Sequence, residues 1–148
     1  ARIGRTIQLE DGRMNLLVMG ERRFRILEIT QQQPYLKAHV RFPEEVVGRP
    51  PPTPKEIEVV RHTLEQYLRT LLGLSGGWDR EMPCPTDPVE LSFHIGAVVR
   101  GENAERQRIL EKPTARDRLF LLAPLLQREH QRNLNRLEKR LNSRERLN

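Results

Sequence analysis

The run Arg49-Pro50-Pro51-Pro52-Thr53-Pro54 constrains the fold of this chain more than any other segment. Proline lacks a backbone N–H and has a fixed φ, so this run can neither pair inside a sheet nor continue a helix. Apolar residues alternate at a period of two before the run, and recur every three or four residues after it. The sequence therefore predicts the α+β class, with strands first and helices second.

Four short strands are predicted before the proline run. Asp11-Gly12 lies between two alternating segments and predicts a hairpin turn, because glycine accepts a positive φ without steric cost. The last strand alternates strictly, with Tyr35, Lys37, His39 and Arg41 on one side and Leu36, Ala38, Val40 and Phe42 on the other. We expect an antiparallel meander that rolls into part of a small barrel, with residues 1–46 as the β-lobe and 47–55 as a linker.

A helical lobe is predicted over residues 56–148. Apolar spacing indicates a first helix over 55–72, with Gly73 as its C-terminal cap. A second helix is expected from Thr86 or Asp87, with Pro88 in its first turn, and a third over 103–112. Thr114 and Asp117 resemble a capping box that opens one long helix over 114–147, bent at Pro124.

The last part of the long helix carries a narrow apolar seam within a basic surface. Its seam residues are Leu134, Leu137 and Leu141. Such a two-position seam is narrower than a core-facing helix needs, and it predicts self-association into a homo-oligomer. The formal net charge is +6, which favours acidic partners of any kind without choosing among them.

The sequence contains no motif for catalysis, for a metal or for a cofactor. None of the nine glycines precedes a lysine, which excludes a P-loop. His39, His62, His94 and His130 have no metal-ligand spacing. No apolar run reaches the length of a membrane span. The single cysteine, Cys84, excludes an internal disulfide and fits a reducing, cytoplasmic setting.

Six residues are candidates for binding a partner protein. They are Tyr35, Phe42, Trp78, Met82, Arg22 and Arg23. The first four are apolar groups at predicted loops or strand ends, where an exposed aromatic side chain can contact a partner. The two arginines could bind acidic groups. Three of the six have an ordinary alternative, since Trp78 can anchor its own loop and the two arginines can form a solvated strand face.

The order of these elements resembles the amino-terminal substrate-binding domain of the Lon protease family. The resemblance rests on the segments Ile3-Gly4-Arg5-Thr6-Ile7, Asp11-Gly12-Arg13, Gly20-Glu21-Arg22-Arg23-Phe24-Arg25-Ile26, Pro34 to Val40, Asp87-Pro88, Glu105 to Glu111, and Arg118-Leu119. It covers nearly the whole chain. It implies a PUA-like β-domain followed by a helical bundle.

In that family the domain captures unfolded or degron-bearing substrates and supports assembly for ATP-dependent proteolysis. Those roles are expectations from the resemblance. The family's domain normally begins with a Pro-Leu-Phe-Pro-like strand and a Phe-Glu-x-Arg-Tyr motif, and this sequence shows neither. We therefore expect part of the barrel to be missing from this chain or not ordered.

An RNA-binding module is the alternative, because PUA-like folds include RNA binders and the chain is basic. Against it, residues 1–45 hold eight basic and six acidic side chains, which is nearly balanced. Aromatic residues are 5% of the chain, and base stacking needs them. An independent hydrolase is a third reading, but no nucleophile–base pair is visible.

Overall fold

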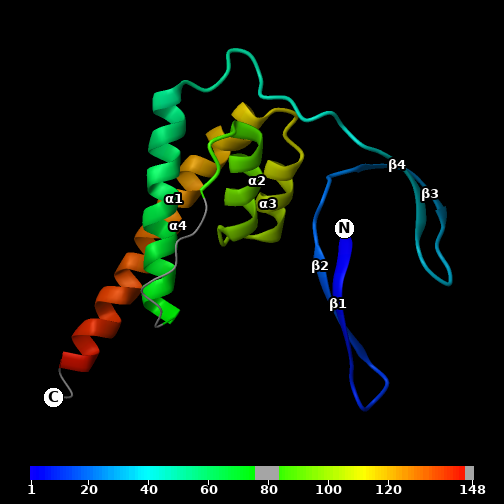
Figure 1. The fold of residues 1–148 in the computed structure, drawn as a ribbon, viewed down its shortest axis with the longest axis horizontal. Helices are drawn as coiled ribbons and strands as arrows, with labels where there is room; N and C mark the ends of the chain where they lie inside the picture. Colours follow the sequence, from blue (N-terminus) through cyan, green and yellow to red (C-terminus); the bar gives the residue numbers. More distant parts are fainter. Residues whose placement is uncertain (76–83, 146–148) are drawn as a thin grey trace. The chain divides into compact units, whose positions relative to one another are not determined.

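The computed structural model describes residues 1–75 and 84–145 and divides the chain into two compact units. Unit 1 is Ala1–Glu44 and unit 2 is Glu45–Asn148. Unit 1 contains four antiparallel strands and unit 2 contains four helices (Figure 1). The predicted α+β class and the order of strands before helices are confirmed. The boundary after Glu44 differs slightly from the predicted β-lobe, 1–46.

Unit 1 consists of two separate β-hairpins. Strands β1 (Arg2–Gln8) and β2 (Met14–Met19) pair in one sheet, and β3 (Arg25–Gln31) and β4 (Lys37–Arg41) pair in the other. Among the described residues β2 does not pair with β3, so the predicted continuous meander is interrupted at residues 20–24 and no barrel closes.

The turn between β1 and β2 is the one that Asp11-Gly12 predicts. Gly12 has φ +81°, which an L side chain rarely adopts. The Asp11 carboxylate accepts hydrogen bonds from the Arg13 backbone N–H (3.1 Å) and Nε (2.7 Å). The bonds from Arg13 also lower the pKa of the Asp11 carboxyl.

Unit 2 is built around α4 (Ala115–Glu145), which contacts the other three helices. These are α1 (Pro54–Ser75), α2 (Pro88–Val98) and α3 (Asn103–Leu110). The core lies between α1, α2 and α4 and includes the fully buried Leu64, Tyr67, Leu91, Ile95, Leu122 and Leu126. Figure 1 shows α1 and α4 side by side in this unit.

The starts of α2 and α4 use capping residues that the sequence predicts. Asp87 Oδ1 accepts hydrogen bonds from the N–H groups of Val89 and Glu90, both at 2.9 Å, at the start of α2. At the start of α4, the Asp117 N–H donates to Thr114 Oγ1 (3.1 Å) and that hydroxyl donates to Asp117 Oδ2 (2.7 Å). The prediction that Gly73 ends α1 was wrong. Gly73 is buried inside α1 because packing of the helix outweighs the low helix propensity of glycine.

The predicted linker belongs to the helical unit. We call residues 45–51 the strap. The first two amides of α4, Ala115 and Arg116, donate to the strap carbonyls of Val46 (2.8 Å) and Val47 (2.9 Å). The Arg116 guanidinium donates to the carbonyls of Pro50 (2.8 Å) and Pro51 (3.2 Å). The strap therefore supplies acceptors for orphan donors at the N-terminus of α4.

Arg118 of α4 joins the strap to α2 and to the α3–α4 turn, although it is charged and only 1% exposed. Its guanidinium reaches the Glu45 carboxylate (3.2 Å), the Ser92 hydroxyl (2.9 Å) and the Lys112 carbonyl (3.3 Å). It also lies 4.3 Å from the centroid of the Phe93 ring. Strap, α2 and the α3–α4 turn thus meet on one side chain of α4.

We expect Arg118→Ala to destabilise unit 2 by about 3 kcal/mol. The substitution removes the ion pair with Glu45 and two hydrogen bonds to buried acceptors. Removing one partner of a buried ion pair typically lowers the free energy of unfolding by roughly 3–5 kcal/mol. Urea unfolding followed by far-UV circular dichroism measures the change. Arg108→Ala on the exposed face of α3 is the control, with a change below about 0.5 kcal/mol. Equal stability of the two variants would contradict the role assigned to Arg118.

Gly48 gives a second test of the strap. Its φ is +105°, and a Cβ there would lie 3.0 Å from Thr114 Oγ1 and 3.1 Å from Arg116 Cβ. Gly48→Ala is expected to cost about 2 kcal/mol, from backbone strain plus this collision. The matched control is Gly96→Ala inside α2, where a Cβ meets nothing within 4 Å. That variant should gain roughly 0.5–1 kcal/mol from helix propensity. Thermal unfolding of both proteins would reveal opposite shifts, and shifts of the same sign would refute the assignment.

Candidate protein-binding site

Both hairpins of unit 1 expose their large apolar side chains. Exposed fractions range from 38% at Val40 to 70% at Leu36. The exposed set comprises Ile3, Ile7, Met14, Leu16, Leu17, Val18, Met19, Phe24, Ile26, Leu27, Ile29, Tyr35, Leu36, Val40 and Phe42. Exposed apolar surface that is contiguous and extends beyond a few hundred Å² is typical of binding sites.

Two of the predicted binding residues, Arg22 and Phe42, meet at the open end of the β3–β4 hairpin. The Arg22 guanidinium lies 4.4 Å from the centroid of the Phe42 ring. The Phe24 ring meets the Phe42 ring edge-on, with centroids 6.5 Å apart. We call Arg22, Phe24 and Phe42 the aromatic cluster. Together with Ala1, Glu21 and Val40 it lines a cavity of about 320 Å³.

The other predicted binding residues lie elsewhere. Tyr35 is in the β3–β4 turn, at the opposite end of the hairpin from the aromatic cluster, and is 60% exposed. Lys37 Nζ lies 5.1 Å from the centroid of the Tyr35 ring. Arg23 precedes Phe24 but does not line the cavity. Trp78 and Met82 lie outside the described residues.

Phe24 is the member of the cluster that the sequence interpretation missed. The signal was the strand register, because Arg25 pairs with Arg41, which brings the preceding Phe24 next to the following Phe42. That pairing could have been read from the alternation in the two strands once their turn was located.

The predicted self-association seam lies on the part of α4 that extends beyond α2 and α3. Leu134 and Leu137 are half-buried in this unit, and Leu141 is 47% exposed. Arg140 Nη1 donates to the carbonyl of Leu74 in α1, so this part of α4 runs beside the end of α1. Self-association through the seam stays a prediction.

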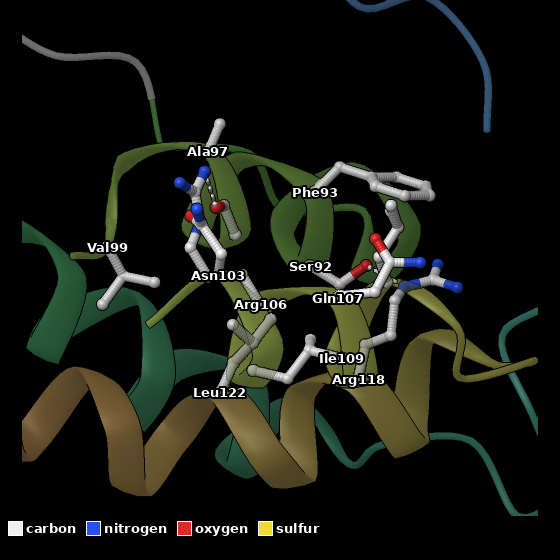
Figure 2. A pocket seen from close by; sticks show the side chains of 12 residues that line it. Ser92, Phe93, Ala97, Val99, Asn103, Arg106, Gln107, Ile109, Arg118 and Leu122 are labelled. Atoms are coloured by element: carbon white, nitrogen blue, oxygen red, sulfur yellow. Dashed lines mark hydrogen bonds between the residues drawn. The ribbon is translucent and has the colours of Figure 1, made fainter. Parts of the chain in front are cut away.

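A second cavity, of about 430 Å³, lies among α2, α3 and α4 (Figure 2). Its walls include Phe93, Ala97, Ile109 and Leu122, so it suits an apolar group. The charged groups beside it are already engaged. Arg118 binds Ser92, and Arg106 Nη2 donates to the Gly96 carbonyl at 3.3 Å (Figure 2). The cavity brings no nucleophile and base together.

Burial shifts the pKa values of two titratable groups in the helical unit, Cys84 and His130. Cys84 is half-buried, and burial raises the pKa of its thiol, which opposes thiolate formation. Burial also lowers the pKa of His130, whose Nδ1 lies 3.5 Å from the Thr70 hydroxyl.

Two features are absent from residues 1–75 and 84–145. No group of three or more His, Cys, Asp or Glu side chains there is placed to hold a metal ion. None of the helices described combines the length and the apolar character that crossing a membrane requires.

Comparison with known proteins gives a consistent result. Residues 1–128 match the family model of the ATP-dependent protease La (LON) substrate-binding domain. The chain is 30% identical over 129 residues to a Lon protease of Desulfovibrio desulfuricans, an alignment covering 84% of this chain and 14% of that protein. It is 29% identical over 139 residues to a Lon protease of Anaeromyxobacter dehalogenans and to Lon protease 2 of Myxococcus xanthus, covering 88% of this chain and 16% of each relative. The chain thus spans about one-seventh of the length of these relatives.

Proposed function

The chain belongs to the substrate-binding domain family of ATP-dependent protease La (Lon), and from this membership we propose that it captures unfolded or degron-bearing proteins for ATP-dependent proteolysis. In this proposal the chain itself carries out no chemistry, acts in the cytoplasm and supports assembly of the protease. ATPase and peptidase activities are those of a complete protease.

The exposed apolar surface of unit 1 is the observation that carries the proposal. An isolated two-stranded hairpin is marginally stable in water, so apolar side chains on it gain most when a partner covers them. Unfolded proteins differ from folded ones in exposing apolar side chains along an extended chain. The two surfaces are therefore complementary in chemistry.

The aromatic cluster is the best candidate for the centre of this surface. Aromatic residues and arginine are the side chains that dominate binding energy at protein interfaces. The cluster holds one arginine and two phenylalanines within contact distance, with Phe24 54% and Phe42 49% exposed. Val40, beside the cluster, extends the apolar surface along β4.

We expect Phe42→Ala to weaken binding of a permanently unfolded protein by about ten-fold. Truncation of a central aromatic residue typically costs more than 1 kcal/mol, and 1.4 kcal/mol corresponds to a factor of ten. Biolayer interferometry of the 148-residue chain against reduced, carboxymethylated α-lactalbumin measures it. Native α-lactalbumin should give no signal.

Phe120→Ala is the matched control, because Phe120 is a 79% exposed phenylalanine on α4. It should leave the affinity unchanged. Circular dichroism of each variant establishes that the fold is retained. The proposal fails if the unfolded protein does not bind, or if only Phe120→Ala weakens binding.

A further inference from the structure

The outer edge of β4 is a place where a third strand can be added. Among the strands described, β4 pairs with β3 along one edge only. Four of its five residues are exposed, and Ala38 is half-buried. A strand edge with unpaired N–H and C=O groups is a template for an extended peptide.

The two faces of β4 differ sharply in chemistry. Lys37, His39 and Arg41 lie on one face, because side chains alternate along a strand. Ala38 and Val40 lie on the other face, which continues to Phe42. One face is basic or titratable throughout, and the other is apolar throughout.

The strand register strengthens the positive charge of the first face. Arg25 lies directly opposite Arg41, and Gln31 lies opposite Lys37. Like charges directly opposite one another are unfavourable, so a carboxylate of an added strand, beside Arg41 on its outer side, would offset part of this repulsion. One acidic side chain is already on this face, because Glu28 lies 3.7 Å from His39. Glu28 offsets charge at the middle of this face, so its positive charge is concentrated at the two ends, at Arg41 and Lys37.

The register extends the apolar face in the same way. Ile26 lies opposite Val40 and Ile29 lies opposite Ala38. A strand that pairs beside β4 therefore places its own side chains alternately next to cations and next to apolar groups.

We propose that the outer edge of β4 binds, as an added strand, extended segments in which acidic and apolar side chains alternate. This inference rests on the proposed function and deepens it by naming a class of substrate. Backbone hydrogen bonds supply affinity that is independent of sequence, and the alternating faces of β4 supply the preference. Aromatic side chains of the bound segment would also contact the aromatic cluster where the segment passes Phe42.

The test compares fluorescein-labelled twelve-residue peptides by fluorescence anisotropy. The first alternates Val with Asp, the second has the same composition with the Asp residues grouped, and two others alternate Val with Ser or Val with Lys. We expect the Val-Asp peptide to bind about five-fold more tightly than the Val-Ser peptide, because exposed ion pairs are individually weak. The grouped peptide should lose this advantage, and N-methylation of alternate amides should weaken the Val-Asp peptide further, because it removes backbone donors.

A charge reversal on β4 tests the site itself. Lys37→Glu combined with Arg41→Glu should reverse the preference, so that the Val-Lys peptide binds more tightly than the Val-Asp peptide. The control is Arg136→Glu combined with Lys139→Glu on the exposed face of α4, which changes net charge equally. A reversed preference also shows that the variant hairpin is folded.

The outcomes separate this inference from the proposed function. Equal binding of all alternating peptides, with unfolded α-lactalbumin still bound, overturns the strand preference alone. Loss of all peptide and protein binding overturns both. If the Arg136→Glu and Lys139→Glu control also reverses the peptide preference, the preference comes from net charge and the β4 site is overturned. Tighter binding of a labelled single-stranded oligoribonucleotide than of the Val-Asp peptide, lost on reversal at β4, assigns the edge to RNA and overturns the inference.

Discussion

The guanidinium of Arg118 is the interaction on which the helical unit depends most. A buried cation is costly unless it is paired and hydrogen-bonded. Here the Glu45 carboxylate forms an ion pair with it, and the Ser92 hydroxyl and the Lys112 carbonyl accept hydrogen bonds from it. Those acceptors come from the strap, from α2 and from the α3–α4 turn. The strap in turn accepts hydrogen bonds from the first amides of α4. The ion pair and the helix capping thus hold the strap against the start of α4.

The two units divide the requirements of a binding domain between them. Unit 2 buries its apolar residues against α4 and holds a conventional core. Unit 1 leaves its large apolar side chains exposed along two hairpins. A surface that binds many different unfolded chains benefits from apolar side chains on an accessible backbone edge, because such contacts require little of a particular sequence. The membership of a substrate-binding family and the chemistry of unit 1 are consistent on this point.

Local signals predicted most of the fold. Three local features could be predicted because each joins residues that are only a few positions apart in the sequence. They are the Asp11-Gly12 turn, the Asp87 cap and the Thr114–Asp117 capping box. The contacts of Arg116 and Arg118 with the strap could not be predicted from the sequence, because they join residues 65 or more positions apart along the chain. Gly73 misled the prediction for the same reason, because packing decides its state. Of the candidate binding residues, the sequence identified Arg22 and Phe42 but not their partner Phe24, whose position depends on the pairing of β3 with β4.

In the proposed function, unit 1 holds the bound protein. Hydrogen–deuterium exchange of the 148-residue chain, with and without saturating unfolded α-lactalbumin, tests this placement. We expect slower exchange in peptides from residues 22–42 and unchanged exchange in α1 and α4, whose amides are already paired within their helices. Slower exchange confined to the helices, with residues 22–42 unaffected, would contradict it.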